Sequence, residues 1–317
     1  MLPRMTSYRL IAFALFAASA FPLTSCGPDA DLPIMAGNTQ AAASQGEQFY
    51  QKAKQADDAG NTGKAIKLYD QTATRFPFAP SAPQARFRQA QLLEQQGEIV
   101  KSFDAYDKFL SRFQGSGLYT TAFNRQAAMA QSAADGDVKS SMLGLKTKIS
   151  LEKTVEMLGK VRDNAPKSAA ASKAQFTIGR LYEGKNDKSK EAITAYRQLV
   201  RDQPASAEAP EALFRVGLIL TAEADRGNQN QANLDLAREA FNDYLIQYPG
   251  HSRNGEARKF LANVGGRDLQ RSYDIAEFYQ KTGKTESAKV YYRDIVNREK
   301  SGPLHDKARA RLKELGE

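Results

Sequence analysis

Apolar and polar positions alternate along most of this chain with the period of an α-helix. The stretch KAIKLYDQTATRFPFAP, residues 64–80, places the small Ala65 and the aromatic Tyr69 four residues apart, so both lie on one helix face. Pro77 lacks the amide hydrogen that would continue this helix, so we expect the helix to end there. The preceding residues 49–60 have an apolar face of their own and end at a glycine, a common helix cap. The pattern therefore predicts two short helices that lie back to back.

This arrangement of small, aromatic and proline positions recurs along the chain. Five further copies are centred on Tyr106, Leu158, Tyr196, Phe241 and Tyr292. A single helix pair cannot bury its apolar face, but a stack of about three or more pairs can. Paired helices with small residues at the crossing and a proline at the exit resemble the tetratricopeptide repeat. The resemblance implies an all-α solenoid of about six helix-turn-helix repeats over residues 46–317, closed by a charged C-terminal capping helix over 303–315.

Three places depart from the regular pattern. The first helix of the third repeat should end near Ala134, and residues 139–149 follow without a clear period before Ser150, which predicts a helix N-cap. The fifth repeat carries an extra loop at 225–232, and Gly265 and Gly266 should end a helix that begins near residue 256. No segment has the alternation typical of a strand, so we expect no sheet.

The first residues predict an export signal followed by a lipid anchor. A basic leader precedes an apolar run of twelve residues, 10–21, which is shorter than the ~20 residues a membrane-spanning helix needs and typical of a signal peptide. Residues 23–27, LTSCG, resemble the bacterial lipobox, in which the cysteine is lipidated and becomes the mature N-terminus. The prediction is a signal peptide over 1–25, lipidation at Cys26 and a flexible tether over 26–45. The alternative is an ordinary secretory signal with a chance cysteine.

The residue after the cysteine bears on the destination of such a protein. Gly27 stands where an Asp would stand in an inner-membrane lipoprotein, so by resemblance to lipoprotein sorting in Gram-negative bacteria we expect the periplasmic face of the outer membrane. No other apolar run is long enough to span a membrane, so we expect the mature protein to be anchored and not to span. Several acyl chains at ~0.8 kcal/mol per buried methylene would make that anchor stable.

The net charge of +9 is concentrated in one part of the chain. Residues 139–190 hold twelve Lys or Arg against five Asp or Glu. This window predicts a basic surface for an acidic partner or anionic lipid headgroups, with Lys146, Lys148, Lys153 and Lys160 as its candidate residues. The alternative is a solvated helix face. A secreted chain without basic motifs interleaved with aromatic residues gives no reason to expect a nucleic-acid partner.

No catalytic chemistry is indicated. The only two histidines, His251 and His305, lie at repeat exits without cysteine or carboxylate clusters at ligand spacing, and no nucleophile sits in a recognisable motif. We therefore expect no enzyme activity, no metal and no cofactor.

Two stretches resemble a particular family of repeat lipoproteins. Arg75-Phe76-Pro77-Phe78-Ala79-Pro80 is similar to the RYPFGP-type segment that closes the first repeat of the BamD family, which belongs to the outer-membrane β-barrel assembly machinery. The C-terminal stretches over 237–249, 257–261 and 273–279 resemble the last repeats of that family. The basic stretch over about 139–205 looks like a repeat beyond the family's usual five.

The resemblance implies a periplasmic scaffold. Its C-terminal repeats would dock on the periplasmic domains of the barrel-inserting outer-membrane protein, and its N-terminal repeats would face unfolded outer-membrane protein peptides. Arg75, Phe76 and Phe78 would then belong to a peptide groove, although Phe78 packing between repeats is an alternative.

Two other functions use the same kind of repeats. One is an accessory lipoprotein of peptidoglycan or envelope-constriction machinery. Such proteins often trimerise through an N-terminal coiled coil, and no heptad precedes Gly46. The other is a solenoid that carries or regulates a murein hydrolase, for which the chain has no catalytic motif.

Overall fold

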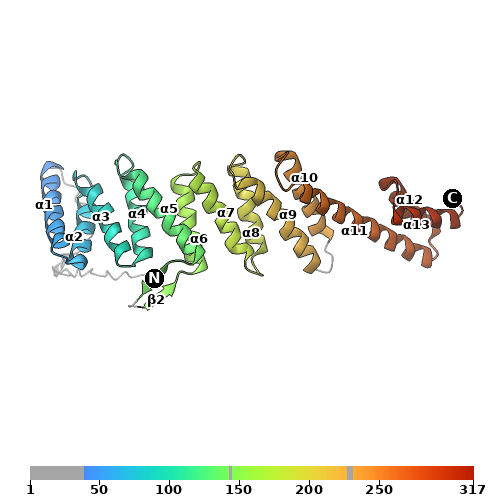
Figure 1. Ribbon diagram of the computed structural model, residues 1–317, viewed down its shortest axis with the longest axis horizontal. Coiled ribbons are helices and arrows are strands. Elements are labelled where there is room, and N and C mark those ends of the chain that lie inside the picture. The colour runs from blue at the N-terminus through green and yellow to red at the C-terminus, as the bar shows by residue number, and fades with distance from the viewer. Residues whose placement is uncertain (1–38, 143–144, 227–230) are drawn as a thin grey trace, which may run out of the picture.

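Paired helices follow one another in a row along the whole molecule (Figure 1). The computed structural model describes residues 39–142, 145–226 and 231–317, and this part of the chain forms thirteen helices and one β-hairpin. The helices are α1 (Thr39–Asp58), α2 (Thr62–Arg75), α3 (Ala82–Gln95), α4 (Ile99–Arg112), α5 (Tyr119–Asp135), α6 (Leu151–Asn164), α7 (Ala169–Glu183), α8 (Ser189–Asp202), α9 (Ala209–Arg226), α10 (Gln231–Gln247), α11 (Asn254–Lys281), α12 (Thr285–Arg298) and α13 (Pro303–Glu314).

The expected all-α solenoid of six repeats is confirmed. Six successive pairs run from α1 and α2 to α11 and α12, each helix packs on its sequence neighbours, and α13 covers the last pair. The turns of the first, second and last pairs contain Gly60, Gly97 and Gly283, each with φ near 75°, which L-residues with side chains rarely adopt. None of the described helices is long and apolar enough to cross a membrane.

The aromatic residues of the repeat pattern form the core. Tyr69, Tyr106, Tyr196, Tyr244 and Tyr292 are all buried, and burying a large side chain of this kind stabilises the fold by about 1.5–3 kcal/mol. Two of the contacts depend on glycine. A Cβ on Gly179 would lie 2.5 Å from the Tyr196 ring, and a Cβ on Gly217 would lie 2.6 Å from Phe241. Glycine is therefore the residue that lets the first and second helices of repeats four and five approach so closely.

The first helix begins earlier than the sequence pattern indicates. α1 starts at Thr39, inside the segment expected to be a flexible tether up to residue 45. Residues 39–44 read TQAAAS, and alanine is the strongest helix former, so the helix extends although these residues have no apolar stripe. The predicted signal peptide, Cys26 and the rest of the predicted tether lie outside the described residues.

The expectation of no sheet is wrong in one place. β1 (Lys139–Met142) and β2 (Leu145–Lys148) pair antiparallel, with Lys139 opposite Lys148 and Met142 opposite Leu145. Strands of four residues are too short to show alternation above chance. The predictions on either side are confirmed. α5 ends at Asp135 against a left-handed Gly136, and the Ser150 hydroxyl accepts a hydrogen bond from the Lys153 amide at the start of α6.

The predicted helix end at Gly265 and Gly266 is also wrong. α11 is one helix of 28 residues that passes through both glycines. On one side Val264 is buried beside Ala224 and Leu234, and on the other side Asp268 is buried and accepts a hydrogen bond from Arg238 at 2.5 Å. These contacts keep the helix continuous through two glycines, each of which costs a helix about 1 kcal/mol relative to alanine.

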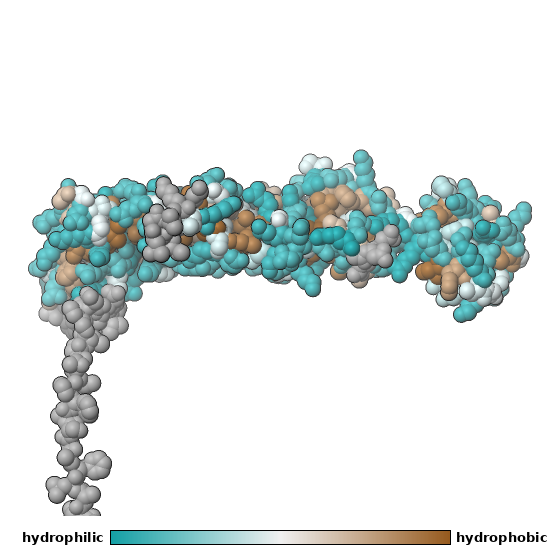
Figure 2. All heavy atoms as spheres, turned by 90° about the horizontal axis from the view of Figure 1, so that it is seen from below, coloured by the Kyte–Doolittle hydropathy of each residue, from teal (hydrophilic) through white to brown (hydrophobic). Residues whose placement is uncertain are grey.

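The far end of the rod depends on this long helix. α12 and α13 pack on each other and on the last part of α11, around a cluster that includes Tyr273, Tyr292 and Leu312. Figure 2 shows that the surface seen from below is largely polar, with apolar side chains in separate small areas. The molecule therefore presents two ends, α1 to α4 and α11 to α13, joined by the middle repeats (Figure 1).

Candidate functional site

A hollow of about 690 Å³ lies between α2 and α4, the second helices of the first two repeats. Its walls come from the end of α2, the following turn with Pro77 and Phe78, Arg86 of α3, and Lys108, Ser111 and Arg112 of α4. The sequence predicted a peptide groove in repeats one and two, and this hollow lies between the second helices of those repeats.

Phe78 is the predicted site residue that lines this hollow. The Ala79 amide donates a hydrogen bond to the Phe76 carbonyl at 3.0 Å, which closes a turn with Pro77 and Phe78 at its two central positions. Ala79 and Phe76 are buried, so the turn leaves Phe78 pointing outward with 70% of its surface exposed. The Arg112 guanidinium lies over its ring at 5.8 Å from the centroid.

The other two predicted groove residues lie elsewhere. Phe76 is 3% exposed and packs against the Phe49 ring at 5.2 Å, so it belongs to the core between α1 and α2. Arg75 is half-buried, with its guanidinium 6.0 Å from the Phe76 ring, and is not part of the lining. Of the three predicted groove residues, only Phe78 therefore lines the hollow. Phe76 packs in the core, and Arg75 lies beside it.

Arg86 forms a fixed wall of the hollow. Its side chain is almost fully buried, forms an ion pair with Asp70 and donates hydrogen bonds to Thr74 Oγ1 and Gln89 Oε1, both at 2.6 Å. A buried guanidinium without such partners would be strongly destabilising, so these bonds make its place in the wall stable. Its charge is neutralised by Asp70 and is not free to bind a ligand.

Lys108 and Arg112 supply the free charge of the hollow. Both are exposed on α4 and, among the described residues, neither forms an ion pair, while no Asp or Glu lines the hollow. Sequence reasoning missed them. Their spacing of four on a predicted helix was visible, but their position opposite the turn at Phe78 depends on how the two repeats stack.

The four lysines predicted as a basic surface do not form one free patch. Lys153 of α6 lies 3.0 Å from Glu156 and 3.6 Å from Asp104, and Lys160 lies 2.8 Å from Asp107. Lys148 is exposed at the end of β2, and Lys146 stands opposite Ser141 in the hairpin. Two of the four therefore join α6 to α4.

Acids outside the basic window balance much of its charge. Besides Lys153 and Lys160, Arg180 pairs with Asp135 at 3.4 Å and Lys188 pairs with Glu191 at 2.9 Å. The acidic partners of these four side chains that lie outside residues 139–190 are Asp104, Asp107, Asp135 and Glu191. Counting charge along the chain overstated the surplus because helix packing brings Asp104, Asp107 and Asp135 beside the window, and Glu191 directly follows it in sequence.

Asp107 is the most deeply placed of these acids. Burial alone would raise the pKa of its carboxyl, but hydrogen bonds from Lys160, Asn164 and Gln126 together lower it below the ordinary value. The carboxylate is thus held ionised as a junction between α4, α5 and α6. This arrangement is a structural role for Lys160.

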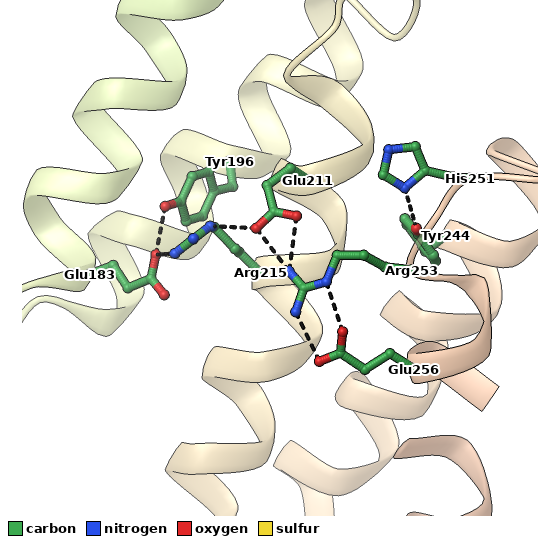
Figure 3. A network of polar contacts seen from close by, with 8 residues as sticks. All are labelled: Glu183, Tyr196, Glu211, Arg215, Tyr244, His251, Arg253 and Glu256. Atoms are coloured by element: carbon green, nitrogen blue, oxygen red, sulfur yellow. Dashed lines mark hydrogen bonds and ion pairs between the residues drawn. The ribbon is translucent and has the colours of Figure 1, made fainter. Parts of the chain in front are cut away.

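A ladder of alternating charges joins repeats four to six (Figure 3). Glu183 accepts hydrogen bonds from Tyr196 at 2.6 Å and from Arg215 at 2.9 Å. Arg215 also donates a hydrogen bond to Glu211, and Glu211 accepts another from Arg253. Arg253 donates to Glu256 as well, and its guanidinium carbon lies 3.7 Å from the centroid of the Phe214 ring. Burial and the neighbouring Glu183 raise the pKa of the Tyr196 hydroxyl, so it stays a neutral donor.

The ladder fixes α7, α9 and α11 relative to one another and leaves no reactive group free. His251 is likewise engaged, with Nδ1 2.6 Å from the Tyr244 hydroxyl, and His305 lies beside Asp306 at 2.9 Å. In the described ranges no group of three or more His, Cys, Asp or Glu is placed to hold a metal ion. The polar side chains of the ladder are thus engaged in contacts between helices.

Two segments of the chain match a known repeat family. Residues 50–117 and 176–252 match the model of a tetratricopeptide repeat family. These segments contain the hollow at Phe78 and most of the charge ladder. The fold of the described residues is thus that of a tetratricopeptide-repeat solenoid, and repeats of this kind serve in protein–protein interaction. No curated protein matches the chain.

Three solved structures illustrate the likeness. MamA (41-end) from Desulfovibrio magneticus RS-1 is 15% identical, with 65% of this chain and 97% of that chain covered and a TM-score of 0.28. A tetratricopeptide repeat protein from Parabacteroides merdae is 14% identical, with coverage of 86% and 99% and a TM-score of 0.29. PilF of Pseudomonas aeruginosa is 12% identical, with coverage of 86% and 99% and a TM-score of 0.28.

Proposed function

We propose that the protein is a lipid-anchored periplasmic scaffold of the outer-membrane β-barrel assembly machinery. In this proposal it binds the barrel-inserting subunit at its C-terminal repeats and unfolded outer-membrane protein peptides at its N-terminal repeats. The observation that best supports the proposal is the exposed position of Phe78. The segment over 75–80, which resembles the BamD family, holds this aromatic side chain 70% exposed at the edge of a hollow.

The opposite end of the rod supports the second half of the proposal. Phe278 of α11 and Val290 of α12 are 61% and 59% exposed, and Ile246 of α10 is 76% exposed. In this proposal they are contacts of the docked subunit, because contiguous apolar surface marks protein interaction sites. They lie within residues 209–300, where the sequence resembles the docking repeats of the family.

The direct test is affinity purification of the protein from detergent-solubilised envelopes. We expect a large barrel protein to co-purify with it. Recovery of peptidoglycan-binding or constriction proteins without a barrel protein would favour the accessory-lipoprotein alternative and contradict the proposal.

The anchor is tested separately at Cys26. Cys26→Ala should remove the lipidated residue, so we expect an unprocessed precursor or a protein released with the soluble periplasmic fraction. Cell fractionation followed by a high-salt wash measures this. If the variant remains fully with the membrane after the wash, the cysteine is not the anchor.

A further inference from the structure

The hollow between α2 and α4 carries a positive charge, from two exposed basic side chains, that the proposed binding of unfolded outer-membrane protein peptides does not explain. Lys108 and Arg112 are both exposed, while the third basic side chain of the lining, Arg86, is neutralised by Asp70. Exposed like charges one helical turn apart repel each other by a few tenths of a kcal/mol. Their mutual repulsion therefore does not stabilise α4, and only Arg112, in the last turn, lies where the helix dipole favours a cation.

The repeat itself does not require this pair. Lys108 and Arg112 follow the buried Tyr106 by two and six residues. The matching positions after Tyr196 are Gln198 and Asp202.

Two other repeats with a buried tyrosine also lack the two cations. The matching positions after Tyr69 are Gln71 and Arg75. After Tyr292 they are Asp294 and Arg298, which pair with each other at 3.2 Å. Two free cations at these positions are thus a property of repeat two, the repeat that faces Phe78.

The spacing suits an extended ligand. Residues four apart on a helix present their side chains about 5–6 Å apart, and alternate side chains of an extended peptide, which share one face, lie about 6.5–7 Å apart. Two acidic side chains at alternate peptide positions would therefore meet Lys108 and Arg112. The next residue on the same face would then lie beside Phe78, whose ring is already 5.8 Å from the Arg112 guanidinium.

We propose that this hollow binds an extended peptide segment of a partner protein that carries acidic side chains at alternate positions followed by an aromatic side chain. This inference rests on the proposed peptide site and narrows its ligand. Its failure can be distinguished from failure of the docking proposal, because affinity purification measures binding at repeats five and six and does not measure peptide binding at the hollow.

The test uses the full-length chain with Cys26→Ala and fluorescent synthetic peptides. The probe is Ser-Asp-Ser-Asp-Ser-Phe-Ser with an amidated C-terminus, and its control has Asn in place of both Asp. Fluorescence anisotropy should show the acidic peptide binding at least tenfold more tightly. The difference should shrink between low and physiological salt because exposed charges are screened beyond a Debye length of about 8–10 Å.

Variants assign the effect to the hollow. Lys108→Glu with Arg112→Glu should weaken binding of the acidic peptide at least tenfold. The matched control is Arg197→Glu with Arg201→Glu, the same charge change at the same spacing on exposed positions of α8. Equal binding of both peptides, or an equal loss in the control variant, would overturn the proposal.

Two further arms exclude other occupants. If the Asn peptide binds tightly only with a free C-terminal carboxylate, the hollow recognises a chain end and the proposal is wrong. The chain itself carries Asp29 and Asp31 at alternate positions. If the acidic peptide binds only after both are changed to Asn, the occupant is this segment and not a partner.

Discussion

At the scale of single residues, exposure separates the aromatic side chains of one short segment. Phe76 and Phe78 are two positions apart, yet the first is 3% and the second 70% exposed. The sequence predicted that Phe78 lies beyond the helix end, because Pro77 ends the helix. It could not decide between core and surface, because that depends on the turn closed by the Ala79 amide.

Phe78→Ser should abolish peptide binding at the hollow and leave the melting temperature unchanged, because the ring is not packed in the core. Phe76→Ser is the control. It removes a buried ring and should cost about 3–5 kcal/mol, as loss of a core phenylalanine does. Thermal unfolding and peptide binding are measured on both. A fall of several degrees for Phe78→Ser would contradict the assignment.

The lysines show the limit of counting charge along a sequence. We expect Lys160→Glu to destabilise the protein by about 1–2 kcal/mol, because it places a carboxylate beside Asp107 and removes a charged donor. Lys148→Glu changes an exposed residue and should have little effect. Urea unfolding distinguishes them. Similar stability of the two variants would mean that Lys160 is an ordinary surface lysine.

The same pair gives a pH signature. The folded-state pKa of Asp107 is lowered, so its contribution to stability is fully present above the ordinary carboxyl pKa and is lost as pH falls through the lower folded value. The difference in unfolding free energy between the native chain and Asp107→Asn should therefore be constant near neutral pH and shrink below about pH 4. A constant difference down to pH 2 would contradict the assigned pairing.

At the scale of elements, the helical period predicted the pairs well and their interruptions poorly. Ser150 and the end of α5 follow from local capping chemistry, and both were predicted. Gly265 and Gly266 read locally as a helix end, but Val264 and Asp268 pack on α9 and α10 on either side of them. Tertiary contacts of this kind override local propensity and are not visible in one sequence.

Gly265→Ala and Gly266→Ala test the continuous helix. Apart from the adjacent residues and backbone of α11 itself, no described atom lies within 4 Å of the Cβ that either change would add. Each should therefore stabilise the protein by about 0.5–1 kcal/mol through the lower flexibility of the unfolded chain. Chemical denaturation measures the change.

The matched controls are Gly179→Ala and Gly217→Ala. Their added methyl groups would clash with Tyr196 and Phe241, and overpacking of a core costs about 1–3 kcal/mol. Destabilisation by alanine at 265 or 266 would instead show that the chain needs glycine there, as a helix break would.

At the scale of the whole molecule, the rod separates its two candidate surfaces. The exposed Phe78 follows α2, and the exposed Phe278 and Val290 belong to α11 and α12. These helices lie toward opposite ends of the molecule (Figure 1). The repeats and their order were predictable from the apolar pattern. The hollow was not, because its lining comes from two repeats and its shape depends on how they stack.

Truncation after Ser272 separates the ends without cutting the contacts of α11 with the preceding repeat. It keeps Asp268 and its partner Arg238, and removes the cluster around Tyr292. We expect that the barrel protein no longer co-purifies with the truncated protein. The remaining repeats should keep their helical circular dichroism signal, and peptide binding at Phe78 should be unchanged. Loss of peptide binding as well would mean that the two ends are not independent.

The central claim is that one rod holds a peptide at one end and the barrel-inserting protein at the other. Affinity purification from solubilised envelopes, with co-purifying proteins quantified by mass spectrometry, tests it most directly. The full-length protein and the Phe78→Ser variant should recover the barrel protein in equal amounts, and the protein truncated after Ser272 should recover none. Absence of any barrel protein from the full-length sample, or its equal recovery with the truncated protein, would contradict the account.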